Sequence, residues 1–254
     1  MKKKILAITL CVAMLAIMLV SGTLAYFTDT DAATNVMTTG KVNIRQNEQQ
    51  RGESGLEEFV DNKALMPMVD TRAEGEATVV DGYFNSKMNN VVDKIITVTN
   101  EANAGAINQD AYVRTILAFE TTEVYEAGTD TVIGDAHYMY IGTLGDFEYV
   151  DADPATDGVQ FSYITVNGVK YVLAVKVYEN VLGPTQETEP SLKQIFMAPT
   201  ANNEVMDLFG EAYTILALSQ GTQVAGFENA ATALDTAFGA VNAANCQNWF
   251  LEIA

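Results

Sequence analysis

Alternating apolar and polar positions recur through the middle of the chain. A period of two, rich in β-branched and aromatic residues, is typical of a strand with one buried face. We therefore expect strands over 41–45, 91–99, 112–121 and 212–218. The Gln- and Glu-rich residues 46–58 predict a loop, and residues 59–90 predict a long connection.

A β-hairpin is the clearest local prediction. Residues 160–166 run into Asn167-Gly168, and residues 169–178 continue the alternation. Asn-Gly suits the two positive-φ positions of a type I′ turn, the usual connection of a tight hairpin. We expect its tyrosines to lie in the core or at the rim of a β-sandwich rather than to form a ligand platform. These tyrosines are Tyr163, Tyr171 and Tyr178.

The end of the chain changes to a helical period. One predicted helix has an apolar face made of Phe227, Ala231, Leu234 and Phe238. Gly239 is a natural stop for it. A second helix is expected over 243–250, with Asn242 as its cap. The order of strands followed by helices predicts a mainly β protein: an antiparallel β-sandwich with α-helical additions near the C-terminus, as a single domain over 41–254.

The amino terminus has the three parts of a secretory signal peptide. Three lysines at 2–4 precede an uncharged apolar run from Ile5 to Val20, and small residues follow at Thr23 and Ala25. We therefore expect residues 1–25 to be a signal peptide cut between Ala25 and Tyr26, and the protein to be secreted. An uncleaved membrane anchor is the alternative, although a span needs about 20 residues.

Charge and cysteine content narrow the class of protein. The chain has 14 basic and 33 acidic side chains and a formal charge of −19. Loss of the three leader lysines would leave −22, the wrong sign for binding nucleic acid or anionic lipid. Cys11 lies inside the leader, so Cys246 would be alone and no intramolecular disulfide could form. This pattern favours a bacterial surface protein that relies on core packing.

Catalytic motifs are absent from the sequence. There is one histidine, His137, whereas a zinc site usually needs several His or Cys ligands, and no His-Glu-x-x-His, Gly-x-Ser-x-Gly or phosphate-binding loop occurs. We therefore expect no enzyme activity and no cofactor. Asp151, Asp153 and Asp157 form the one weak calcium candidate. Their spacing is not that of an EF-hand, so a solvated turn is the favoured interpretation.

The junction after the signal peptide resembles the TasA–camelysin family. The resemblance rests on three stretches, Gly22–Asp31, Ala33–Asn35 and Gly40–Ile44. It covers residues 1–44 only. Two further stretches are similar to relatives found in Gram-positive anaerobes. One is Asp93–Asn100 with Ala111–Thr115, and the other is Leu216–Gln220 with Gly226–Phe227 and Ala233–Gly239.

This resemblance implies a jelly-roll-like β-sandwich exported by Gram-positive bacteria through a SipW-type signal peptidase. It implies a biofilm matrix fibre or cell-surface subunit that polymerises with itself, with other matrix or cell-wall components as further partners. In such fibres the N-terminal segment of one subunit adds as a strand to the next. Here the extended segment is 26–40, and its donor part would run from Tyr26 to Val36 with Phe27 and Val36 as anchors.

Two other functions stay open at this point. Camelysins are described as metallopeptidases, although the residue pattern of a zincin is missing from this chain. A monomeric surface module, an adhesin or another ligand-binding sandwich, would have the same composition and fold class.

Overall fold

The computed structural model describes residues 28–32, 42–61, 63–102, 109–121, 141–152, 161–199, 201 and 212–253. Within these residues the protein is mainly β, with two short helices at the end. The strands are β1 (Thr28–Ala32), β2 (Ile44–Gly52), β3 (Gly55–Glu58), β4 (Val69–Asp70), β5 (Val79–Val80), β6 (Tyr83–Phe84), β7 (Met88–Asn89), β8 (Val91–Asn100), β9 (Ala111–Glu120), β10 (Ile141–Gly145), β11 (Glu148–Tyr149), β12 (Tyr163–Val166), β13 (Val169–Leu182), β14 (Leu192–Met197) and β15 (Ile215–Gln223). The helices are α4 (Ala230–Phe238) and α5 (Ala243–Ile253).

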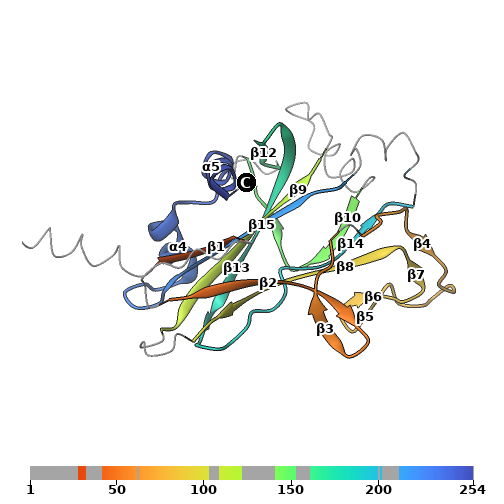
Figure 1. The fold of residues 1–254 in the computed structure, drawn as a ribbon, viewed down its shortest axis with the longest axis horizontal. Coiled ribbons are helices and arrows are strands. Elements are labelled where there is room, and N and C mark those ends of the chain that lie inside the picture. Colours follow the sequence, from red (N-terminus) through yellow and green to blue (C-terminus); the bar gives the residue numbers. More distant parts are fainter. Residues whose placement is uncertain are drawn as a thin grey trace, which may run out of the picture.

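Two antiparallel sheets form the body of the molecule (Figure 1). The first has the order β1-β15-β9-β13-β11, with β12 also paired to β13, and the second has the order β10-β14-β8-β2-β3. The chain passes between the sheets from β8 to β9, from β13 to β14 and from β14 to β15. Such repeated crossing places residues that are far apart in sequence on facing strands.

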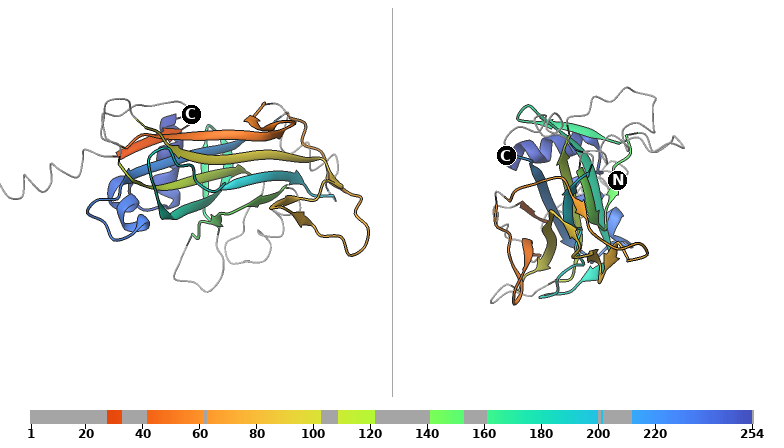
Figure 2. Two further views of the ribbon diagram at one scale, coloured as in Figure 1. Left: turned by 90° about the horizontal axis from the view of Figure 1, so that it is seen from below. Right: turned by 90° about the vertical axis from the view of Figure 1, so that its right-hand side faces the viewer.

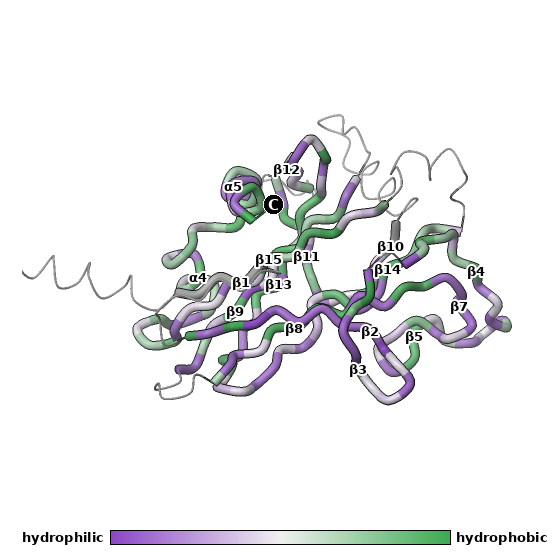
Figure 3. Tube along the Cα trace, viewed as in Figure 1, coloured by the Kyte–Doolittle hydropathy of each residue, from purple (hydrophilic) through white to green (hydrophobic). Residues whose placement is uncertain are grey.

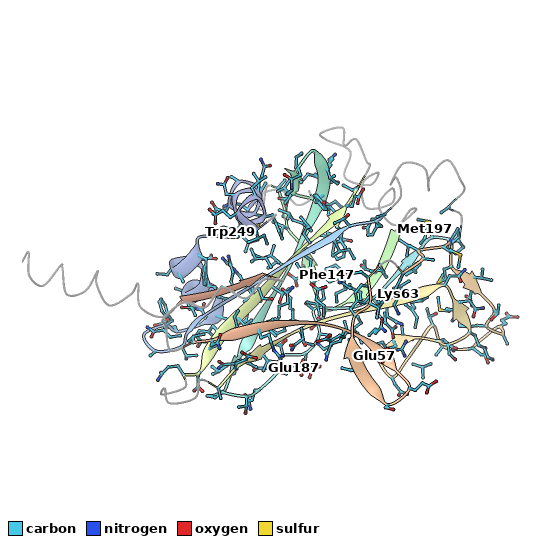
Figure 4. The ribbon with its side chains drawn as sticks, viewed as in Figure 1. Glu57, Lys63, Phe147, Glu187, Met197 and Trp249 are labelled. Carbon is cyan, nitrogen blue, oxygen red and sulfur yellow. The ribbon has the colours of Figure 1, made fainter. Side chains whose placement is uncertain are left out.

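The core lies between these two sheets, which makes the fold a β-sandwich. At one end Ile96 and Leu192 of the second sheet pack with Leu117, Phe119 and Val172 of the first. Phe147, labelled near the centre of Figure 4, packs against the same cluster. At the other end Ile44 and Val98 meet Val113 and Tyr178. This packing confirms the predicted mainly β, antiparallel fold class.

The C-terminal helices cover the outer face of the first sheet. Phe250 and Cys246 of α5 are buried with Ile116 of β9 and Leu173 of β13, while α4 buries Leu234 beside Tyr112. Figures 1 and 2 show both helices at the same end of the elongated molecule as β1. Strand β9 is therefore buried on both faces, one toward the second sheet and one toward the helices.

Local turn and cap predictions are confirmed. Asn167 and Gly168 have φ values of 50° and 85°, the conformation that a type I′ turn requires. Helix α4 ends at Gly239 as predicted, and its N-cap, which was not predicted, is Asn229, whose side chain accepts a 2.9 Å hydrogen bond from the Thr232 N–H. Asn242 accepts an equivalent bond of 2.9 Å from Asn245 at the start of α5.

The predicted loop over 46–58 is wrong. These residues belong to the β2–β3 hairpin, whose register pairs Gln49 with Glu58 and Gly52 with Gly55. Hydrophilic residues run along much of β2 in Figure 3, so no apolar alternation marks it. The strand forms because β8 pairs with its backbone, and Gln50 is buried even though it is polar.

Two boundaries also differ from the predictions. The strand expected over 212–218 runs from Ile215 to Gln223, so its polar second half was missed. In α4, Ala231 is exposed, and Ala230 and Ala233 take the buried positions beside Leu234. Phe227 precedes the helix, yet it packs with Phe238 against the same cluster as Leu234, so Ala231 is the one predicted face residue that lies outside.

The long connection between β3 and β8 carries the two-residue ladders β4–β7 and β5–β6. It docks on the sandwich through Phe84, whose ring meets the edge of Phe196 with centroids 5.1 Å apart. The connection lies at the opposite end of the molecule from the helices (Figure 1). Neither described helix is long and apolar enough to span a membrane.

Candidate assembly edge

Strand β1 lies at one edge of the first sheet. It pairs antiparallel with β15 in a register from Thr28 opposite Thr222 to Ala32 opposite Leu218. Residues 28–32 belong to the segment predicted as a donor strand. The rest of that prediction lies outside the described residues: Tyr26, Phe27, Val36 and the cleavage site between Ala25 and Tyr26.

Strand β15 is deeply buried between β1 and β9. With β1 in place, Leu218, Ser219, Gln220 and Thr222 are each at most 2% exposed. Backbone N–H and C=O groups of a buried strand need hydrogen-bond partners, and an uncovered edge presents a row of them. In this structure β1 supplies these partners along Leu218–Thr222, and without β1 this stretch would be the margin of the sheet.

On its inner face, β15 is held against the second sheet. The Ser219 hydroxyl donates a 2.7 Å hydrogen bond to the side-chain oxygen of Gln46 on β2, and it shares a 3.3 Å bond with the Thr115 hydroxyl. At Gly221 the strands come so close that a Cβ atom would lie 2.8 Å from Cγ2 of Ile44. Only glycine fits this approach without displacing a neighbour.

On its outer face, β15 is joined to the helices through a buried arginine. Arg114 of β9 is 1% exposed and donates three hydrogen bonds of 2.7 Å each, to the side chains of Gln220 and Asp235 and to the carbonyl of Gly239. Trp249, labelled in Figure 4, places its ring 5.3 Å from the guanidinium carbon. Burial lowers the pKa of Arg114, while the hydrogen bond that it donates to Asp235 opposes that change.

The strand predicted over 112–121 contains Arg114, but the sequence predicted no role for it. The available signal was a single cation on the same face as Tyr112, Ile116 and Ala118. A charge on a buried strand face needs a partner. The sequence did not reveal that Asp235 and Gln220, more than 100 positions away, are the partners.

The calcium candidate lies mostly outside the described residues. Asp151 forms an isolated bridge with Phe161, while Asp153, Asp157 and His137 lie outside the described residues. In the part of the chain that the structure describes, no three metal-ligating side chains gather. The hairpin tyrosines lie as expected, with Tyr171 and Tyr178 buried and Tyr163 half-buried.

A second polar site lies at the base of the β3–β8 connection. Arg51 donates bonds of 2.7 and 2.8 Å to the two carboxylate oxygens of Asp93, and it stacks over the Tyr83 ring at 4.2 Å. Gln194 also donates to Asp93 at 2.7 Å. Arg51 and Asp93 line an open pocket of about 360 Å³ together with Lys63. Because Arg51 and Asp93 already satisfy each other, their arrangement is that of an anchor for the connection.

Two carboxyl groups should respond to pH in opposite directions. Partial burial acts to raise the pKa of Asp93, but its bonds from Arg51 and Gln194 outweigh burial and lower it. Burial raises the pKa of Glu120, and the bonds from Thr214 only partly offset that. Asp93 therefore contributes stability above its ordinary pKa, and this is lost as pH falls through its folded pKa. Glu120 contributes stability below its ordinary pKa, and this is lost as pH rises through its folded pKa.

The variants Asp93→Asn and Glu120→Gln should separate these effects. Asp93→Asn is expected to cost more stability at about pH 7 than at about pH 3, because only the ionised form gains from Arg51. Relative to the unaltered protein, Glu120→Gln should be most stable at about pH 7, because there the unaltered protein carries an ionised carboxylate that is partly buried. Urea unfolding across this range tests both. Parallel pH profiles for the two variants would contradict the assignment.

Taken together, the fold and this edge define a class: a β-sandwich with a helical cover, in which the first strand of the described residues forms the margin of a sheet by pairing with β15. Comparison with models of protein families, with curated proteins and with solved structures finds no match to this chain.

Proposed function

We propose that the protein is a secreted structural subunit of an extracellular matrix or cell surface, and that it polymerises by strand exchange. In the polymer, the segment around β1 of one subunit occupies the β15 edge of the next. The observation that carries the proposal is the β1–β15 pair: a five-residue terminal strand covers an edge that is buried at Leu218–Thr222. The resemblance of residues 1–44 to the TasA–camelysin family supports the same function.

The exchange leaves the backbone hydrogen bonds of the β1–β15 pair unchanged in number. The same backbone pairs form within one chain or between two chains, so the swap costs little beyond association. Nine residues separate Ala32 from Val42, and a chain of that length spans at most roughly 30 Å when extended. A strand passed on in this way makes a head-to-tail contact, which generates an open filament when it does not close on itself.

The opposite side of the first sheet is a poorer acceptor. Beyond Val175, where its pairing with β11 ends, β13 carries Lys176, which forms an ion pair with Asp146. The pairing of β13 with β9 also shifts its register between Tyr178 and Leu182. A lysine and an irregularity are devices that blunt an edge against further pairing. We therefore assign acceptance of the strand to β15.

Electron microscopy and light scattering of two chains would test the proposal. One chain begins at Tyr26 and the other lacks residues 26–36. We expect fibres from the first and none from the second, because the second has no strand to donate. Fibres that persist after the deletion would contradict strand exchange. Monomers in both samples would favour the surface-module alternative.

Two proline variants sharpen this test. Successive N–H groups of a strand point to opposite sides, so only one of Asp29 and Thr30 directs its N–H toward β15. Proline is tolerated on an edge strand where the lost N–H faces solvent and not where it joins the ladder. We expect one of Asp29→Pro and Thr30→Pro to abolish fibres and the other to retain them. Equal behaviour of the two would mean that backbone pairing does not join the subunits.

A further inference from the structure

Arg114 lies at the middle of a row of residues that crosses the first sheet. In the strand register Val177 is opposite Arg114, Arg114 is opposite Gln220, and Gln220 is opposite Thr30. Thr30 is the central residue of β1, so the row ends at the centre of the β1–β15 contact. The 2.7 Å bond from Arg114 to the Gln220 side chain thus reaches the strand-accepting edge at its midpoint.

The same guanidinium fixes the end of α4. It bonds to Asp235 in the last turns of the helix and to the carbonyl of Gly239, the residue that ends it. The Gly239 N–H in turn bonds to the Asp235 carbonyl at 2.9 Å. A planar guanidinium holds its donors in a fixed fork, so the orientation of β15 is coupled to that of the helix.

Adjacent residues of β15 are therefore held from opposite faces. Ser219 is bonded toward β2 through Gln46, and Gln220 is bonded toward the helices through Arg114. Two anchors on neighbouring residues restrict rotation of the backbone between them. An edge that is ordered before its partner arrives pays less conformational entropy on binding.

We infer that Arg114 is a positioning residue for the strand-accepting edge, and that it preorganises Leu218–Thr222 to receive a strand with the sequence of β1. Arg114 acts through its hydrogen bond to Gln220, not through contact with the incoming strand. The inference rests on the proposed function for the statement that this strand comes from a second copy of the chain. The local part of the inference is that Arg114 orders the edge. This part holds equally when β1 of the same chain occupies the edge.

Hydrogen–deuterium exchange on the chain beginning at Tyr26 would test the local part. Gln220→Met removes the acceptor for Arg114 at nearly constant volume, and Gln220→Glu restores an acceptor. We expect amide exchange over 28–32 and 218–222 to accelerate at least about tenfold in Gln220→Met and to return to within about twofold in Gln220→Glu. Amides of Ile95 and Ile96, in the core of β8, report global unfolding and should change less. Thr236→Ala, on the exposed side of α4, is the control and should leave the edge unchanged.

A purely structural role predicts a different pattern. In that case the edge and the β8 amides would accelerate by the same factor, and this result would overturn the inference. Unchanged exchange at the edge in Gln220→Met would overturn it as well.

A labelled peptide with the sequence of residues 26–36 tests separately whether the edge accepts this strand from another molecule. In chains that lack residues 26–36, so that their own β1 does not compete for the edge, we expect the chain with Gln220 to take up the peptide faster than the chain with Gln220→Met. Failure of the chain with Gln220 to take it up would count against strand exchange, while the hydrogen–deuterium exchange pattern would still decide the role of Arg114. Equal uptake by both chains would count against positioning.

Discussion

Replacing Arg114 with alanine is expected to lower the free energy of unfolding by about 3–5 kcal/mol. The change removes three hydrogen bonds of 2.7 Å and leaves the buried side-chain oxygen of Gln220 and the carbonyl of the half-buried Gly239 without that donor. It also opens a cavity beneath Trp249, which faces the guanidinium. Asp235 is half-exposed and can be rehydrated, so it adds little to the loss.

Arg45→Ala is the matched control for this prediction. Arg45 forms a 2.9 Å ion pair with Glu101, but its side chain is 52% exposed. Exposed pairs contribute about 0–1 kcal/mol, so its loss should be within about 0.5 kcal/mol of neutral. Urea unfolding monitored by tryptophan fluorescence measures both variants, since Trp249 lies beside the site. A loss below about 1 kcal/mol for Arg114→Ala would show that the buried network is not stabilising.

Gly221→Val is expected to cost about 3 kcal/mol and to release β1 from its edge. The Cβ atom of any larger residue would lie 2.8 Å from Cγ2 and 3.2 Å from Cδ1 of Ile44, inside normal contact distance. Overpacking of this kind typically costs about 1–3 kcal/mol, and the two further methyl groups of valine place the effect at the upper end. The strain falls between β15 and β2, the two strands that β1 contacts.

A double-mutant cycle identifies the cause of that loss. Ile44→Ala removes the clashing atoms, so Gly221→Val should cost at least about 1 kcal/mol less in that background. Gly52→Ala is the control, because its Cβ atom would meet only the flexible carboxylate of Glu57, and it should change stability by less than about 1 kcal/mol. An unchanged cost of Gly221→Val in the Ile44→Ala protein would place the strain elsewhere.

Local sequence signals were sufficient for part of the fold. The Asn167-Gly168 turn, the Asn242 side-chain cap and the stop at Gly239 depend on the conformation of a few neighbouring residues. The type of β9 could also be predicted because Tyr112, Val113, Thr115, Ile116 and Phe119 are β-branched or aromatic. The hairpin, the helices and the mainly β class followed from such signals.

The polar strands could not be predicted in the same way. Strand β2 is formed by Gln, Glu and Asn residues that have no apolar alternation, and the second half of β15 is Ser-Gln-Gly-Thr-Gln. Their burial depends on partners that complete their hydrogen bonds. The sequence therefore predicted a loop where β2 lies and a strand that ended too early where β15 lies. These two stretches nevertheless provide the inner and outer anchors of the candidate edge.

The sequence by itself determined the acidic character, the strand-rich composition, the hairpin turn and the helix ends, because each depends on residues that are close along the chain. Only the tertiary structure decided that Ser219 meets Gln46, 173 positions away, and that Arg114 meets Asp235, 121 positions away. A buried polar group is stable only where a partner satisfies it, and that partner is brought by the crossing of the chain between sheets. For the same reason the fold, and not the composition of β15, made its edge the candidate site.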